Sequence, residues 1–286
     1  MNSIVRETQK QYSFLDNLLT NFWISYLKSS FAFKWQFHNI KWRNSKAKPG
    51  YAYKPTEAEK MANVITHGIW ILPAVMAASQ LFERSKTSGQ LLVSWVYGGA
   101  LTMLFTISTF FHCSAYCPHK INITCFRGLK NVLHRCDRGM IYVFIAASYF
   151  PWLQLDNPSK SHLFLFMEWI IWIIAAFGII YQQIFHERFK CLETCFYIVM
   201  GLGPAFVVII SGNEFHGMTE LKLGGLSYIV GICFFKSDGI IPMAHAIWHL
   251  FVVLAAGLHY YAIILYLYPK DVAAPIQAAR ERNFKL

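Results

Sequence analysis

The segment Gly239–Tyr268 reads GIIPMAHAIWHLFVVLAAGLHYYAIILYLY and contains no aspartate, glutamate, lysine or arginine. About twenty apolar residues in a helix are enough to cross the hydrocarbon core of a bilayer. The segment is longer than that, so it predicts a transmembrane helix. Near its start lie His245 and His249, four residues apart and therefore on one face of the helix.

Hydrocarbon does not solvate an imidazole, so each of these histidines requires a partner, a cavity or a metal ion. Two histidines at i and i+4 supply two of the ligands that a tetrahedral metal site needs. The pair alone is a weak signal, because most such pairs serve packing or hydrogen bonding. A metal site therefore depends on a third ligand at the same membrane depth.

The composition indicates a polytopic membrane protein: 55% of the residues are hydrophobic and 14% are charged, whereas soluble domains have about 25% charged residues. The formal net charge is +11. Much of the basic excess lies in the first sixty residues, before the first apolar segment. That position favours a cytosolic flank attracted to anionic lipid. No nucleic-acid recognition motif accompanies it, so we expect no nucleic-acid partner.

Uncharged runs of near-spanning length indicate an all-α, seven-transmembrane helix bundle. The seven segments are Met61–Phe82, Thr87–Cys113, Gly139–Leu155, Trp169–Phe185, Thr194–Asn213, Leu223–Phe235 and Gly239–Tyr268. The sixth is the shortest, but Lys222 and Lys236 at its ends can extend their charges to the interface. This domain covers residues 54–268, with a basic extension at 1–53 and a short tail at 269–286. Within the extension, Phe14–Phe33 fits an interfacial amphipathic helix or a partly disordered segment.

The loop charges predict a cytosolic N-terminus. Five bases lie between the second and third spans, whereas the connection after the third span carries a single base, Lys160, with Asp156 and Glu168. The tail is somewhat basic for the opposite side, which is a mild counter-signal. The sequon at Asn122 would then face the cytosol and remain unglycosylated. Six cysteines fall at the same face and are expected to be reduced: Cys113, Cys117, Cys125, Cys136, Cys191 and Cys195.

Further polar residues meet the histidine pair at this face. His112 ends the second span, with Ser108 one turn earlier, and Asp137 opens the third span. Because consecutive spans alternate in direction, these residues share one side of the membrane with His245 and His249. Three histidines suffice for a catalytic zinc site whose fourth position holds water. Asp137 could activate that water and Ser108 could orient it or a carbonyl, a set that suits hydrolysis.

Plainer interpretations stay open for each residue. Ser108 could bond the helix backbone, and Asp137 could pair with Arg135 or Arg138 at the interface. His67 would be a neighbour of the ligands or a helix-start hydrogen bond. His259 lies about 15 Å deeper along the helix than His249 and should not reach the same metal.

These residues resemble the pattern of the progestin and adipoQ receptor family, which is related to bacterial haemolysin III proteins. The pattern is a first-span E…N…TH, then S-x3-H, an Asp and a closing H-x3-H. Its positions here are Glu59, Asn63, His67, Ser108, His112, Asp137, His245 and His249. The stretches CDRGMIYVFIAASYFPW, FFKSDGIIP and HAIWHLFV resemble the monocyte to macrophage differentiation factor branch. The resemblance covers about Tyr53–Tyr268.

The resemblance implies a seven-helix bundle with a cytosolic N-terminus and Zn2+ held by His112, His245 and His249. It places Asp137 and Ser108 around the metal water. Receptors of the family have ceramide-hydrolase-like activity, and this branch is associated with Golgi and endolysosomal membranes and with promoting kinase signalling. One departure is the separation of His112 from Asp137, which is longer than in the adiponectin-receptor members.

Two functions follow as hypotheses. In the first, the chain is a receptor-like endomembrane protein whose basic cytosolic segments recruit signalling proteins. In the second, it is a zinc-dependent amide hydrolase acting on a membrane lipid such as ceramide. The sequence does not indicate an oligomeric state.

Overall fold

The computed structural model describes residues 41–48, 50–116, 124–156, 162–210 and 217–268. All of these residues belong to one compact unit that begins at Lys41. The predicted interfacial segment Phe14–Phe33, the sequon at Asn122 and the tail 269–286 lie outside the described residues.

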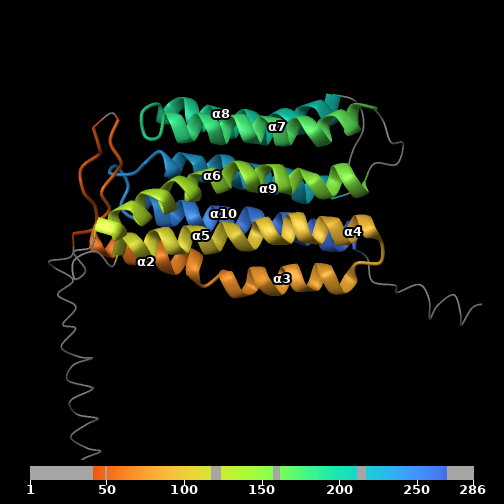
Figure 1. Ribbon diagram of the computed structural model, residues 1–286, viewed down its shortest axis with the longest axis horizontal. Coiled ribbons are helices and arrows are strands. Elements are labelled where there is room, and N and C mark those ends of the chain that lie inside the picture. Colours follow the sequence, from red (N-terminus) through yellow and green to blue (C-terminus); the bar gives the residue numbers. More distant parts are fainter. Residues whose placement is uncertain (1–40, 49, 117–123, 157–161, 211–216, 269–286) are drawn as a thin grey trace, which may run out of the picture. The chain divides into compact units, whose positions relative to one another are not determined.

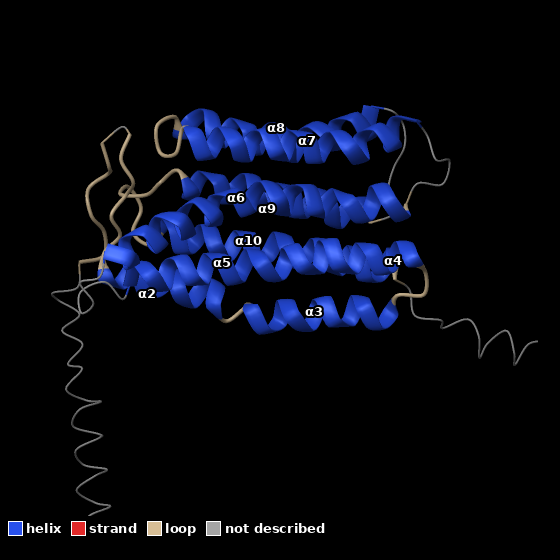
Figure 2. Cartoon of the chain, in the orientation of Figure 1, coloured by secondary structure: helices blue, strands red, loops and turns tan. Residues whose placement is uncertain are grey.

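The described residues form helices and loops, with no strand among them (Figures 1 and 2). The elements in order are α2 (Glu57–Gly68), α3 (Ile71–Arg84), α4 (Ser88–Val93), the π-helical turn η2 (Ser94–Gly98), α5 (Gly99–Tyr116), α6 (Thr124–Leu155), α7 (His162–Ile184), α8 (Lys190–Ile210), α9 (Met218–Phe235), α10 (Ala244–Ala262) and the π-helical turn η3 (Ile263–Leu267).

Six helical units are long and apolar enough to cross a membrane. They are Glu57–Arg84, Ser88–Ala115, His162–Ile184, Lys190–Ile210, Met218–Phe235 and Ala244–Leu267. The chain is therefore a multi-pass membrane protein. The helix α6 is not among the six; it contains the third predicted span, and the part of the helix before that span is rich in charge.

The first predicted span is divided in two, because α2 ends at Gly68 and α3 begins at Ile71. Pro73 lies in the first turn of α3, where its missing N–H costs nothing. Within one continuous helix the same proline would clash with the carbonyl of Ile69. The sixth predicted span is longer than its uncharged core, since α9 begins at Met218 and includes Lys222.

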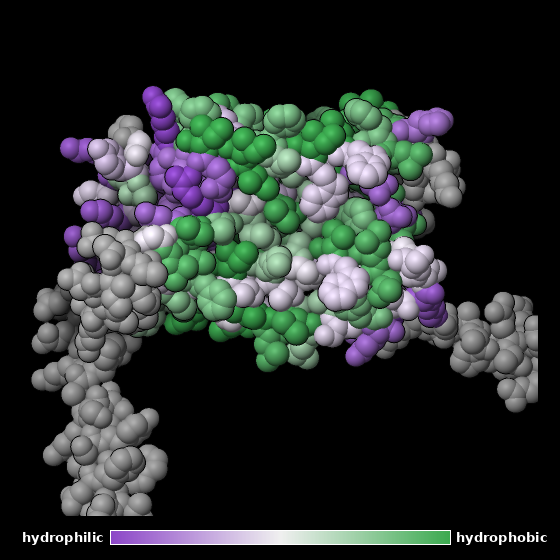
Figure 3. Space-filling view, viewed as in Figure 1, coloured by the Kyte–Doolittle hydropathy of each residue, from purple (hydrophilic) through white to green (hydrophobic). Residues whose placement is uncertain are grey.

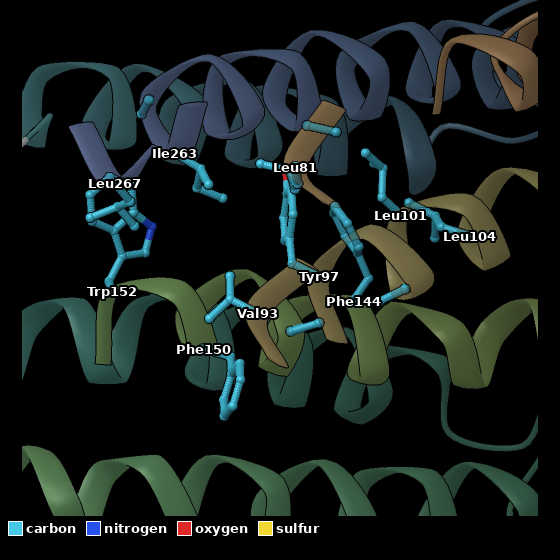
Figure 4. Close-up of a cluster of buried hydrophobic side chains, with 14 of the residues drawn as sticks. Leu81, Val93, Tyr97, Leu101, Leu104, Phe144, Phe150, Trp152, Ile263 and Leu267 are labelled. Carbon is cyan, nitrogen blue, oxygen red and sulfur yellow. The ribbon is translucent and has the colours of Figure 1, made fainter. Parts of the chain in front are cut away.

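The helices are arranged so that α7 and α8 lie at one edge of the bundle and α2 and α3 at the other (Figure 1). Between them, α5 packs on α6, α2 and α3, while α10 packs on α9 and α2. The main core is formed by apolar side chains from α3, η2, α5, α6 and η3, among them Leu81, Tyr97, Phe144 and Ile263 (Figure 4). On the outside, hydrophobic residues cover the middle of the visible face and hydrophilic residues gather toward its ends (Figure 3). This is the distribution expected of a lipid-facing surface.

The start of α2 is fixed by a capping box. The Glu59 carboxylate accepts from the backbone N–H of Thr56 at 2.8 Å, and the Thr56 hydroxyl accepts from the N–H of Glu59 at 3.2 Å. The Tyr53 hydroxyl donates to the same carboxylate at 3.0 Å. Burial, with the adjacent Glu59 carboxylate, raises the pKa of Tyr53 to about 12, so this hydroxyl keeps its proton.

The segment before α2 also contacts the loop that leads into α10. Arg43 Nη1 donates to the carbonyl of Gly239 at 2.8 Å. Gly239 has φ +76°, and a Cβ there would overlap the backbone of Lys46. Only glycine combines this backbone conformation with so close an approach. These contacts bring the first turns of α2 and α10 to the same end of the bundle, where the histidines lie.

Candidate metal centre

Three histidines come together at this end of the bundle. His112, His245 and His249 each offer a ring nitrogen, and the three nitrogens lie within 4.8 Å of one another. The ring centroids are 5.2 Å apart for His112 and His245, 5.0 Å for His112 and His249, and 4.7 Å for His245 and His249. His112 and His249 are almost fully buried, while the side chain of His245 is 23% exposed. The group therefore has two enclosed members and one nearer the solvent.

Helix geometry accounts for the grouping. His245 and His249 lie one turn apart in the first two turns of α10, which begins abruptly after Met243 in a left-handed conformation with φ 58°. His112 lies near the end of α5, which runs in the opposite direction to α10. The end of one helix and the start of the other thus meet at one depth, and their side chains converge.

A hydrogen bond from α2 sets the tautomer of His249. The hydroxyl of Thr66 donates to the carbonyl of Ala62 at 2.8 Å and lies 2.9 Å from Nδ1 of His249. A hydroxyl has one proton, so with Ala62 as its acceptor it must accept from His249 Nδ1–H. The proton of His249 is then on Nδ1, and Nε2 carries the free lone pair. Metal-binding histidines are held in this way by a bond to the second ring nitrogen.

An unpaired ring nitrogen is a second reason why the three histidines suit a metal ion. Within the part of the chain that the structure describes, His112 Nε2 is buried and has no hydrogen-bond partner. A buried polar atom left unpaired is costly, and a metal ion would satisfy it. Imidazole nitrogens about 2.0–2.1 Å from a tetrahedral zinc lie roughly 3.3 Å apart, so modest ring movements would close the group around one ion.

His67 lies against this group without belonging to it. Its ring stacks on that of His249 with centroids 3.6 Å apart and 20° between the planes. Its Nδ1 is 2.8 Å from the hydroxyl of Ser108, and its edge meets Phe105. His67 is thus bonded to Ser108 of α5 and stacks on the His249 ring.

Ser108 is buried, and its hydroxyl bonds His67. Asp137, on α6, has its carboxyl within interaction range of Ser108 and His245. The neighbouring arginines direct their guanidinium groups elsewhere: Arg138 pairs with two glutamates, and Arg135 donates to the carbonyl of Gln183 at 2.5 Å. Asp137 lies beside Ser108 and His245, and the charge of Arg138 also acts on its carboxyl.

Two other residues of the predicted pattern have separate positions. Glu59 is used in the capping box of α2. Asn63 is buried one turn later, and its Oδ1 is unpaired among the described residues. His259 belongs to the last turns of α10 and is not part of the histidine group.

A second group of metal-ligand type was not predicted. His134 on α6 meets His186 and Glu187 in the connection between α7 and α8, with one donor atom of each within 4.8 Å of the others. About fifty residues separate His134 from the other two, and no ligand spacing marks them. Only the packing of α7 against α6 brings them together.

The sequence itself agrees with this architecture. Residues 56–260 match the family model described as haemolysin-III related. The chain belongs to this family. It is 46% identical over 237 residues to the monocyte to macrophage differentiation factor of Rattus norvegicus, covering 82% of this chain and 95% of that protein. The human protein of the same name is 46% identical over 79% of this chain and 91% of its own length.

A bacterial relative is less similar in sequence. The hemolysin-3 homolog of Bacillus subtilis is 32% identical over 220 residues, which are 74% of this chain and 95% of the bacterial protein. The family resemblance predicted from the sequence motifs is confirmed.

Proposed function

We propose that this member of the haemolysin III-related family is a seven-span membrane protein with a zinc centre, and that it hydrolyses an amide bond of a membrane lipid. The zinc ligands are His112, His245 and His249, near the cytosolic face. The observation that carries the proposal is the convergence of three imidazole nitrogens, one of them buried and unpaired, beside the carboxyl of Asp137.

The seventh span is α6, which crosses the membrane with its apolar part, 139–155. The helix lies between α5 and α7, both of which are long and apolar enough to span. Its charged first half would extend out of the hydrocarbon on the cytosolic side. An odd number of spans then puts the two termini on opposite sides, with the N-terminus cytosolic.

Zinc bound at the three histidines would lower the pKa of a coordinated water toward about 7 and polarise a carbonyl oxygen. Asp137 would accept the proton of the attacking water and deliver it to the leaving amine nitrogen, so that the products are a fatty acid and an amine. Ser108, held by His67, would orient the carbonyl. The substrate class is a lipid amide such as a ceramide, entering from the bilayer.

A second function is favoured by the burial of His112 and His249, with relative exposures of 5% and 2%. Zinc enclosed between α5 and α10 could serve as a structural tie in a receptor-like protein. Such a protein would act in signalling at Golgi or late endosomal and lysosomal membranes and recruit cytosolic signalling proteins.

Purified full-length protein distinguishes the two functions. Wild type, Asp137→Ala and His249→Ala are compared for zinc content and for fatty-acid release from ceramide, with His259→Ala as a control on the same helix. The hydrolase predicts that Asp137→Ala keeps its zinc and loses at least about 100-fold in rate. The structural role would be supported if His249→Ala loses zinc while wild type releases no fatty acid from ceramide. Zinc content unchanged in His249→Ala would refute the site.

A further inference from the structure

The group formed by His134, His186 and Glu187 lies at the same end of the bundle as the histidine centre. His134 stacks on Phe111, the neighbour of His112, with ring centroids 4.6 Å apart and 7° between the planes. His186 and Glu187 belong to the short connection between Ile184 and Lys190. The predicted topology puts this connection in the cytosol.

One donor atom of each side chain lies within 4.8 Å of the others, and a rotation of the His134 ring would turn a single nitrogen toward both partners. His186 Nε2 and His134 Nδ1 are 3.1 Å apart, close to the roughly 3.3 Å expected for two imidazoles on one zinc ion. The other nitrogen of His134, Nε2, is 3.6 Å from Glu187 Oε1. Two histidines and a glutamate are a ligand set that zinc uses in hydrolytic enzymes.

Each member of the group is held in place by its own contact. The stacked Phe111 ring fixes the plane of His134. The side-chain amide of Gln182 contacts His186 Nδ1 at 2.9 Å. Glu187 has φ 65°, a backbone conformation that is strained for a residue with a side chain and persists only where the surroundings impose it. Its side chain is nevertheless buried.

We infer that His134, His186 and Glu187 form a second metal site, which takes a divalent transition-metal ion of the zinc class. Nitrogen and carboxylate donors together suit such ions, whereas calcium and magnesium prefer oxygen donors alone. Nothing in the proposed lipid hydrolysis requires this site, so the two can be tested separately.

The charges around Glu187 allow a cation to enter. Arg138 Nη2 lies 2.7 Å from one oxygen of Glu187, and Lys190 Nζ lies 2.5 Å from the other. Arg138 has a second partner, Glu193, at 3.1 Å, and Lys190 is 31% exposed. Oε1, the Glu187 oxygen nearest His134, is the one that Arg138 contacts, so a metal ion would replace Arg138 there while Arg138 keeps Glu193. Lys190 would keep the other oxygen, Oε2, and the carbonyl of Tyr51.

The ligands are in their binding forms at cytosolic pH. Burial, assisted by the positive charge of Arg138, lowers the pKa of His186 to about 4, so this imidazole is neutral. Despite burial, Arg138 and Lys190 lower the pKa of Glu187, so its carboxyl is ionised. Without metal, the N–H of one ring donates to the bare nitrogen of the other. To bind a metal ion, the donor ring would carry its proton on its other nitrogen.

An ion in this position would fasten the α7–α8 pair to α6. His134 is one helical turn before Asp137 on the same face of α6. A metal bound at His134 would thus restrain the helix segment that carries Asp137.

The test is zinc stoichiometry by elemental mass spectrometry on full-length protein in detergent, after equilibration with micromolar zinc and removal of free metal. Wild type is expected to hold two zinc ions per chain. His134→Ala, His186→Ala and His249→Ala should each hold one, and the double variant His186→Ala/His249→Ala none. His162→Ala, an exposed histidine at the start of α7, should keep two.

The series separates the failure of this site from the failure of the first. His186→Ala should keep one zinc ion at the first site, and adding His249→Ala should remove it. Retention of that ion shows that the His186→Ala protein is folded. Wild-type stoichiometry in both His134→Ala and His186→Ala would overturn the second site and leave the first standing. Loss of one zinc in His186→Ala with none lost in His249→Ala would support the second site and refute the first.

Discussion

The hydroxyl of Thr66 decides which nitrogen of His249 faces the metal centre. Because this hydroxyl donates to Ala62, it receives the Nδ1 proton of His249 and leaves Nε2 bare. The role is easily overlooked, since a threonine that bonds the carbonyl four residues earlier is common in helices. Here the same side chain has a second partner on α10.

Thr66→Val should therefore weaken zinc binding while leaving the fold intact. The substitution keeps the shape of the side chain and removes the acceptor for His249 Nδ1–H. Loss of such an outer partner typically costs about 10–100-fold in metal affinity. Competition with a chelator of known affinity measures the effect at the first site, in a His186→Ala background that removes the second.

Thr102→Val is the matched control, because the Thr102 hydroxyl bonds the carbonyl of Gly98 at 2.9 Å with no histidine partner. Its zinc affinity should equal that of the parent. Equal affinities for the two threonine variants would contradict the assigned tautomer of His249.

For single residues, the sequence predicts which histidines come together better than it predicts the side chains that contact them. The grouping of His112 with His245 and His249 follows from the alternating direction of helices, which sequence reveals through apolar runs. The contacts of Thr66 and Phe111 depend on the rotation of each helix about its own axis. That rotation is set by packing along the whole helix, and no local pattern encodes it.

Among the helices, the contact between α6 and α7 is fitted around a glycine. Gly178 on α7 lies against the ring of Tyr142 on α6, and a Cβ at this position would overlap that ring. Tyr142 belongs to a cluster of buried apolar side chains from α6, α7 and α8, and Gly178 is buried beside it. This interface also brings the α7–α8 connection to His134, so its spacing matters for the second metal group.

Gly178→Ala is expected to destabilise the protein by about 1–3 kcal/mol, because the added methyl must push α7 away from α6. Gly257→Ala on α10 is the control, since a Cβ there meets nothing within 4 Å. It should be neutral or slightly stabilising, as alanine favours a helix over glycine. Thermal unfolding in detergent compares the two. A melting temperature of Gly178→Ala equal to that of Gly257→Ala would show that α7 is not closely packed there.

The bounds of a helix were predictable from the sequence where the helix coincides with an apolar segment. They were not predictable where the helix is interrupted or extends beyond that segment. The division of the first span near Trp70 follows from Pro73, but the proline alone could equally have marked a kink. The helix α6 begins at Thr124, well before its apolar part at 139. Charged residues do not prevent helix formation, so the start of this helix was invisible to a search for uncharged runs.

In the molecule as a whole, both metal groups are at one end of the bundle. Exposed cysteines mark the same end: Cys136 on α6, and Cys191 and Cys195 in the first turns of α8. Ser88, exposed at the start of α4, lies at the other end. These positions can report on which side of the membrane the metal groups face.

The proposed topology puts the metal groups in the cytosol, where thiols stay reduced. In cells whose plasma membrane alone is permeabilised, a membrane-impermeant maleimide should label wild-type protein through these cysteines. A Ser88→Cys variant in which all seven native cysteines are replaced should be labelled only after the internal membranes are opened. A C-terminal tag should become accessible at that same step, because seven spans put the tail opposite to the N-terminus.

A tail accessible together with Cys191 would mean an even number of spans, with α6 not crossing. Labelling of Ser88→Cys before that of the native thiols, or a glycan on Asn122, would mean that the whole bundle is inverted.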